Sequence, residues 1–168
     1  MGEGAGVGAA AVAVTRVLLV RHAHAGDRAA WRGPDDLRPL SERGRAQAVA
    51  LVALLAPYEL EAVLSSPSLR CVQTVEPLAA ARGLPIREAD ELLEGSGARE
   101  TARWLARQAE QGSLAACTHG DIVPGVLDAA RADGARVPDE LRWAKGSTWV
   151  LTLADGRWRD AEYLPPPA

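Results

Sequence analysis

Two histidines of this chain come just after short apolar segments, where a side chain sits at the end of a predicted strand. Residues 17–20 lead into Arg21 and His22, and residues 114–117 are followed after one position by His119. An imidazole can act as a nucleophile or a base near neutral pH, and an arginine beside it can bind an anion. Two solvated polar residues at a strand end are the plain alternative for one such pair, so the interpretation depends on the remaining residues.

Arg70 supplies a second cation, at a position where a helix is predicted to begin. Ser66 and Pro67 are typical of an N-cap and of the first helical position, which places Arg70 in the first turn. A cation there opposes the helix dipole unless an anion lies nearby, although an exposed helical arginine needs no ligand. Guanidinium groups bind phosphate oxygens bidentately, so Arg21 and Arg70 with the two histidines indicate a phosphate site and phosphoryl transfer to His22.

Such a transfer requires a neutral nucleophile and a proton donor. The neighbouring arginines should disfavour the imidazolium form of His22. A carboxylic acid would protonate the leaving oxygen, and its conjugate base would then activate water to hydrolyse the phosphohistidine. Glu94 is the first choice because nearby glycines allow its loop to turn inward, and Asp27 and Asp121 are the reserves. A solvated surface glutamate is the alternative reading of Glu94.

The chain alternates short apolar segments with amphipathic ones, which indicates an α/β fold with a parallel sheet. In such a sheet the carboxyl ends of the strands meet at one edge, so Arg21, His22, Arg70 and His119 can converge there. Asp121 is the expected cap of the last helix. The predicted strands cover residues 16–20, 62–65, 84–87 (an edge strand, because of Pro85) and 114–117, the helices 41–56, 66–83, 98–111 and 122–130, and a hairpin 148–153 with 158–163.

A long polar segment, residues 26–39, separates the first strand from the first helix. It is rich in glycine, proline and charge, and loops of this length are usually functional or disordered. Trp31 could stack on a substrate while Arg28 and Arg32 bind its phosphate. A mobile solvated loop with a docked tryptophan is the alternative.

Composition fits one ordinary globular domain. With 168 residues, 48% of them hydrophobic, and a formal net charge of −3, the chain can bury a single core and is a poor match for a nucleic acid polymer or an anionic membrane. Positive charge comes almost entirely from arginine, since Lys145 is the single lysine. The sequence divides into a flexible leader at residues 1–14 and a single domain at 15–168.

Cysteine usage and the lack of targeting signals indicate a cytoplasmic protein. Cys71 and Cys117 lie in predicted elements without the spacing of metal ligands, so reduced thiols are expected. The chain has no cationic secretory n-region and no apolar run approaching the roughly 20 residues that span a bilayer. The oligomeric state stays open, because an exposed Trp149 or Trp158 could mark an interface or simply cover the sheet edge.

The chain contains four motifs, which are Arg21-His22-Ala23, residues 39–48, residues 65–74 and Thr118-His119-Gly120. In this order and spacing they resemble the motifs of the histidine phosphatase (phosphoglycerate mutase-like) superfamily. The size of this chain resembles that of the small SixA-type phosphohistidine phosphatases. Residues 70–79 and 145–151 are also similar to the histidine phosphatase domain of two-domain Nudix hydrolases. One departure is Ala23, where glycine is usual in the family.

This resemblance implies a three-layer α/β/α sandwich with a mostly parallel central sheet. It further implies that His22 is the phosphorylated nucleophile, that Arg21, Arg70 and His119 bind phosphate, and that Glu94 falls near the family's proton donor. No metal or other cofactor is expected.

The expected function is that of a metal-independent phosphatase acting on phosphomonoesters or phosphohistidine, so the partner is a phosphorylated small molecule or a phosphohistidine protein. Alternatives are a phosphatase of nucleoside diphosphates, including oxidised guanine nucleotides, and a non-catalytic phospholigand-binding module. A metal hydrolase site built from His22 and His24 with His119 and Asp121 is a weaker alternative, because Arg21 would repel a cation.

Overall fold

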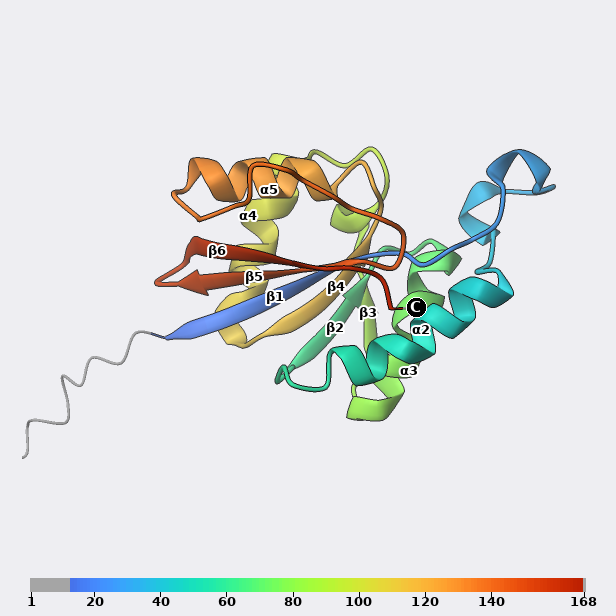
Figure 1. Ribbon diagram of the computed structural model, residues 1–168, viewed down its shortest axis with the longest axis horizontal. Helices are drawn as coiled ribbons and strands as arrows, with labels where there is room; N and C mark the ends of the chain where they lie inside the picture. The colour runs from blue at the N-terminus through green and yellow to red at the C-terminus, as the bar shows by residue number, and fades with distance from the viewer. Residues whose placement is uncertain (1–12, 168) are drawn as a thin grey trace, which may run out of the picture.

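The computed structural model describes residues 13–167, and its strands follow one another as β1 (Val14–Arg21), β2 (Ala62–Ser65), β3 (Ile86–Glu88), β4 (Leu114–Thr118), β5 (Thr148–Ala154) and β6 (Arg157–Leu164). The helices between them are α2 (Glu42–Leu54), α3 (Leu69–Arg82), α4 (Ala98–Gln108) and α5 (Val123–Ala132). The strands form one six-stranded sheet of order β3-β2-β4-β1-β5-β6, drawn through the middle of Figure 1. β3 lies at the sheet edge, as predicted from Pro85, the residue that precedes it.

Strand β1 lies inside the sheet, and nearly all of its apolar side chains are covered on both faces. It pairs in parallel with β4 and antiparallel with β5. Leu18 and Val20 pack with α2 and α3, whereas Val17 and Leu19 pack with α4 and α5 on the opposite face. The pairs β2–β4 and β2–β3 are also parallel, which confirms the mostly parallel α/β/α sandwich (Figure 1).

The sequence predicted the N-cap residues of three helices, and the structure confirms one of the three. Ser41 caps α2 as predicted, because its Oγ accepts a hydrogen bond from Gly44 N at 3.1 Å. The prediction for α3 is wrong by two residues: Ser68 is the N-cap, and Ser66 makes a different contact. Asp121 does not cap α5 either, since Ile122 holds that position without a side-chain hydrogen bond.

The carboxyl-terminal hairpin forms as predicted and buries its tryptophans. Asp155 and Gly156 both have positive φ, 55° and 74°, which is the backbone of a tight two-residue hairpin turn. Trp149 is 1% exposed and Trp158 4% exposed, and both pack in the core beneath α4 and α5. The interpretation of either tryptophan as an exposed interface marker is therefore wrong.

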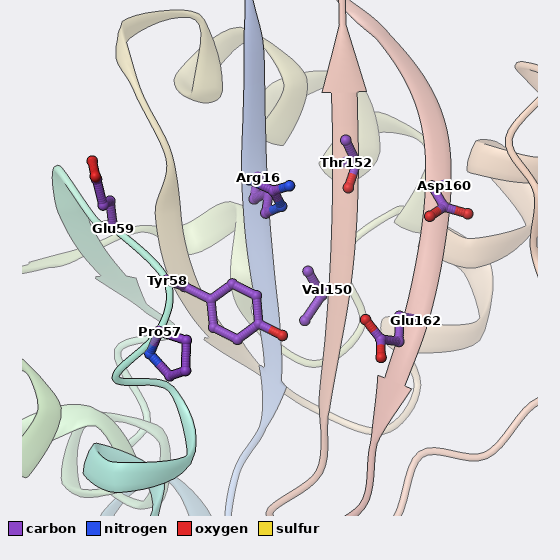
Figure 2. Close-up of a pocket in the computed structure, with 8 residues that line it drawn as sticks. All are labelled: Arg16, Pro57, Tyr58, Glu59, Val150, Thr152, Asp160 and Glu162. Carbon is purple, nitrogen blue, oxygen red and sulfur yellow. The ribbon is translucent and has the colours of Figure 1, made fainter.

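Helices α2 and α3 leave part of their sheet face open, over β5 and β6. A groove of about 530 Å³ lies there. Figure 2 shows the Tyr58 ring over β1, below Arg16 in this view, with the carboxylates of Glu162 and Asp160 across the groove on β6. Arg16 is five positions from Arg21 along β1, so this groove lies toward the opposite end of the sheet from the predicted site.

The predicted leader, residues 1–14, falls almost wholly outside the described residues, and Val14 is already the first residue of β1. Within residues 13–167, no helix has both the length and the apolar character needed to cross a membrane.

Candidate active site

His22 follows β1 directly and is almost completely buried, with 5% of its surface exposed. Its backbone N–H donates to Thr118 O at 3.0 Å, which ties it to the end of β4. The ring Nδ1 donates to Ala23 O at 2.8 Å, so Nε2 keeps the lone pair in the neutral ring. A buried imidazole with a free Nε2 is a nucleophile already in its reactive tautomer.

Burial lowers the pKa of His22 to about 3, and the positive charges of His119, Arg70 and Arg21 add to this shift, while the Ala23 hydrogen bond opposes it. His22 is therefore neutral at physiological pH, as the sequence predicts. The cause differs in part from the prediction, because loss of water exceeds the effect of the arginines.

The neutral imidazole predicts a specific pH dependence of stability. Between the unfolded value of 6.5 and the folded pKa of about 3, the unfolded chain binds one more proton at His22 than the folded chain. The free energy of unfolding should therefore fall as pH drops through this window, by about 1.4 kcal/mol per pH unit. Denaturant unfolding of His22→Asn across the same range should lack this one-proton slope. Identical slopes for the two proteins would contradict a buried neutral His22.

His119, at the end of β4, faces His22 as the parallel sheet predicts. The two ring centroids lie 5.5 Å apart in an edge-on arrangement. On His119, Nε2 lies 2.9 Å from Ser66 Oγ, while Nδ1 lies 3.4 Å from Arg70 Nη2 and 3.7 Å from Glu94 Oε1. Ser66 thus orients the His119 ring. The sequence did not predict this role, because the Ser66-Pro67 pattern is also typical of a helix start.

Arg70 and Arg21 are the two arginines whose charges act on the His22 imidazole. Arg70 is 1% exposed; its Nη2 lies 2.6 Å from Glu94 Oε1 and 3.1 Å from Asp35 Oδ2. Arg21 donates from Nη1 to Trp143 O at 2.7 Å. The Nε atoms of both arginines are buried without a partner among the described residues. Buried donors are rarely left unsatisfied, and phosphate oxygens would satisfy them.

Gly120 leaves room for the Arg21 guanidinium group because glycine has no side chain. A Cβ on Gly120 would lie 2.7–2.8 Å from Cζ, Nε and Nη2 of Arg21, closer than real contacts allow. Gly120→Ala should displace the Arg21 guanidinium and reduce kcat/KM by on the order of 100-fold, the effect of a misplaced catalytic group. Steady-state assays with a matched unfolding curve test this. A folded Gly120→Ala variant of wild-type activity would show that Arg21 does not need this position.

Of the three candidate proton donors, Glu94 is the carboxylate that contacts both Arg70 and Arg28, with Arg28 Nη2 3.1 Å from each of its oxygens. Burial raises the pKa of Glu94, but the Arg28 hydrogen bond and the charges of His119, Arg28 and Arg70 outweigh it and hold the pKa below its usual value. Asp27 and Asp121 bond to backbone instead: Asp27 Oδ1 accepts from Ala29 N at 2.9 Å, and Asp121 Oδ2 from Gly95 N at 2.8 Å.

The segment 26–39 has little regular structure, as predicted, apart from two short 3₁₀ turns at Arg28–Ala30 and Asp35–Leu37. Arg28 reaches the site through Glu94. Trp31, 37% exposed, donates from Nε1 to Pro34 O of its own loop at 2.9 Å. Arg32 is exposed, and no ion pair of its side chain is formed within residues 13–167.

Asp35 is a site residue that sequence reasoning missed. Its Oδ1 lies 3.2 Å from Arg38 Nε and 3.4 Å from Arg28 Nε, and its backbone oxygen accepts from Arg70 Nη1 at 2.9 Å. Arg38 is itself buried and donates to Ala25 O at 2.7 Å. The acidic pair Asp35-Asp36, shortly before the motif at residues 39–48, was the available signal.

Alanine at position 23 fits without strain. Among the described residues other than glycine, positive φ occurs at Asp155 and not at Ala23. Its methyl group is buried with Leu40 and Ala48, and its N–H donates to Thr74 Oγ1 at 2.9 Å. The departure from glycine therefore adds a small apolar contact behind the nucleophile.

His24 lies outside the His22–His119 group. Its Nδ1 is 2.7 Å from Ser41 Oγ, at the start of α2. Across residues 13–167, no three histidine, cysteine or carboxylate side chains are grouped as a metal site requires, so the structure does not assemble the predicted set of His22, His24, His119 and Asp121.

Comparisons with known proteins agree with this geometry. The family model of the histidine phosphatase superfamily (branch 1) matches residues 17–100. An 8-oxo-(d)GTP phosphatase from Mycolicibacterium smegmatis is 40% identical over 156 residues, which is 90% of this chain and 48% of the relative. The chain thus spans about half the length of that curated relative.

Solved structures give the same assignment. SixA from Agrobacterium tumefaciens is 30% identical, with a TM-score of 0.68 over 90% of this chain and 98% of its own. A protein histidine phosphatase SixA in complex with tungstate has a TM-score of 0.69 at 23% identity, over 90% of this chain and 95% of its own, which shows the shared fold. This chain belongs to the histidine phosphatase superfamily, which confirms the family and the phosphoglycerate mutase-like fold predicted from its motifs.

Proposed function

We propose that this chain is a phosphatase that removes a phosphoryl group through a covalent phosphohistidine on His22. One observation carries the proposal: a buried imidazole with its lone pair on Nε2 lies beside two arginines whose Nε–H groups have no partner within the described residues. A site that only binds phosphate needs donors, not an unprotonated nucleophile. The charges that stabilise the transition state belong to arginines, so the proposed reaction needs no metal.

In the first step, His22 Nε2 attacks phosphorus and the bond from phosphorus to the leaving oxygen breaks. In this proposal Arg21, Arg70 and His119, whose charges all act on His22, bind the equatorial oxygens as their negative charge spreads. His119 contributes through Nδ1, the ring nitrogen that faces Arg70, if the Ser66 hydroxyl donates to Nε2.

Glu94 is the proposed proton donor. In the structure the Glu94 carboxyl group is ionised and paired with Arg70 and Arg28. A phosphate dianion at Arg70 would replace that partner and place negative charge beside the carboxylate, which raises the pKa of Glu94 and lets it carry a proton. Glu94 then protonates the leaving oxygen. In the second step its carboxylate takes a proton from the water that attacks the phosphohistidine, releasing inorganic phosphate and restoring His22.

In this proposal the substrates are phosphomonoesters and phosphohistidine proteins, and Arg28, which pairs with Glu94, would contact the organic part. The 30% sequence identity to SixA of Agrobacterium tumefaciens, over 98% of that chain, supports this substrate class. We place the protein in the cytoplasm as a single catalytic domain at residues 15–168, a proposal supported by the two free, buried cysteines.

Phosphate release in the presence of a chelator tests the function. We expect the wild-type chain to hydrolyse p-nitrophenyl phosphate, a phosphohistidine peptide, or both, with no requirement for added metal. Binding of vanadate or phosphate without turnover of any substrate would instead identify a non-catalytic phospholigand-binding module. Activity that the chelator abolishes would contradict the metal-independent mechanism.

A further inference from the structure

Asp35, on the segment 26–39, pairs with a guanidinium group that is almost completely buried. Its Oδ2 lies 3.1 Å from Arg70 Nη2, and its backbone oxygen accepts a hydrogen bond from Arg70 Nη1 at 2.9 Å. The Asp35 side chain is nevertheless 40% exposed, whereas that of Arg70 is buried. The carboxylate therefore reaches a buried cation while part of its own surface stays in contact with solvent, so it can leave Arg70 without opening the core.

Two carboxylates hold the same nitrogen of Arg70. Glu94 Oε1 lies 2.6 Å from Nη2, in addition to Asp35 Oδ2. The neighbouring Nε of Arg70 is buried and has no partner among the described residues. A guanidinium binds phosphate through two parallel N–H groups, and Nε forms one such edge together with Nη2. A phosphate bound along this edge needs the nitrogen that both carboxylates contact.

The second oxygen of Asp35 has partners of its own. Asp35 Oδ1 lies 3.2 Å from Arg38 Nε and 3.4 Å from Arg28 Nε. Burial raises the pKa of Asp35, but the Arg38 hydrogen bond and the charges of Arg70, Arg28 and Arg38 outweigh it and hold the pKa below its usual value. A carboxylate that moved away from Arg70 would therefore keep two cationic partners and its negative charge.

We propose that Asp35 is an internal competitor of the substrate phosphate for Arg70. The phosphoryl group displaces Asp35 Oδ2 from Arg70 Nη2, the carboxylate stays with Arg38 and Arg28, and it returns to Arg70 when inorganic phosphate leaves. This inference rests on the proposed function of His22 and describes how the same site is regulated.

The exchange has a direct consequence for product release. A phosphate dianion and a carboxylate repel each other when they share one guanidinium group, so each weakens the binding of the other. Glu94 escapes this repulsion by taking a proton, as proposed above, whereas Asp35 escapes it by moving to Arg38. Because the returning Asp35 disfavours bound phosphate, the product does not saturate the site.

Binding of inorganic phosphate tests the competition. We expect Asp35→Asn to lower the dissociation constant of phosphate by about 10-fold, because the amide carries no charge that competes for Arg70. Asp36→Asn is the matched control, since it removes the same charge from the neighbouring exposed residue. It should change the constant by no more than about two-fold, the effect of a screened surface charge. Isothermal titration calorimetry of the wild type and both variants is the measurement.

The sign of the effect separates competition from a structural role. If Asp35 served to position Arg70 for phosphate, its loss would raise the dissociation constant of phosphate and the KM of the substrate. Competition predicts the reverse, so the KM for p-nitrophenyl phosphate and the inhibition constant of phosphate should both fall in Asp35→Asn. A folded Asp35→Asn variant whose dissociation constant for phosphate rises or stays the same overturns the inference.

A second measurement follows the displacement in the protein with Asp35 intact. Trp31 Nε1 donates at 2.9 Å to the oxygen of Pro34, the residue before Asp35, so the indole is tied to the backbone that carries the carboxylate. We expect saturating inorganic phosphate to change the tryptophan fluorescence of the wild type, and Trp31→Phe to lack this change. Trp104→Phe, in α4, is the matched control and should keep it. A change of equal size in Trp31→Phe overturns the displacement.

These measurements separate the inference from the function on which it rests, because phosphate binding needs no turnover. Turnover of p-nitrophenyl phosphate by the wild type, with unchanged phosphate affinity in Asp35→Asn, would refute the competition and leave the phosphatase intact. Tighter phosphate binding by Asp35→Asn, without turnover of any substrate by the wild type, would support the competition and refute the proposed function.

Discussion

His22→Asn is expected to abolish phosphate release, with kcat falling by on the order of 10⁴-fold or more, as when a covalent nucleophile is removed. Asparagine preserves polarity and approximate size, but its amide cannot form the phosphorus–nitrogen intermediate. Because Arg21, Arg70 and His119 remain, the variant should still bind vanadate. The measurement is steady-state turnover together with vanadate affinity.

His24→Asn is the matched control for His22→Asn. His24 lies two residues away and contacts Ser41 rather than the arginine group, so its replacement should leave turnover within a few-fold of wild type. If His24→Asn abolished activity and His22→Asn did not, the nucleophile would be misassigned.

Glu94→Gln is expected to have the second-largest effect, and the effect should depend on the leaving group. An alkyl phosphate releases a strongly basic alkoxide that needs a proton, so its turnover should fall by about 10²- to 10⁴-fold. Nitrophenolate leaves without a proton, so the first turnover of p-nitrophenyl phosphate should survive. The following hydrolysis still needs the Glu94 carboxylate, and a burst of one nitrophenolate per enzyme should result.

Glutamine also removes the negative charge from Arg70 and Arg28, so phosphate affinity should rise or stay constant while kcat falls. Glu91→Gln, three residues earlier, is the matched control. A leaving-group dependence seen in Asp121→Asn or Asp27→Asn, and not in Glu94→Gln, would transfer the donor role to that aspartate.

Sequence patterns predicted the elements that place the main site residues because those patterns are local. The apolar runs at 17–20 and 114–117 are strands buried on both faces, and parallel strands end at one edge. His22 and His119 therefore meet although 97 positions separate them. Arg70 joins them because the first turn of α3 opens at the same edge.

The failed predictions concern residues whose partners come from other elements. Ser66 and Ser68 carry the same capping signal, and a contact between Ser66 and His119 determined which of them begins α3. The contacts of Asp35 with Arg28, Arg38 and Arg70 depend on how segment 26–39 folds back, which its composition does not encode. The alternation of side chains along the strand around Trp149 does not reveal which face of the sheet the helices cover. The burial of Trp149 therefore could not be predicted from this pattern.

The most direct test of the central claim is trapping of the phosphorylated protein. Rapid mixing with ³²P-labelled substrate, followed by a denaturing quench, should yield up to one acid-labile, alkali-stable phosphate per chain, and peptide mapping should place it on His22. Glu94→Gln should accumulate it, and His22→Asn should lack it. Full turnover without any phosphohistidine in either the wild type or Glu94→Gln would contradict the covalent mechanism.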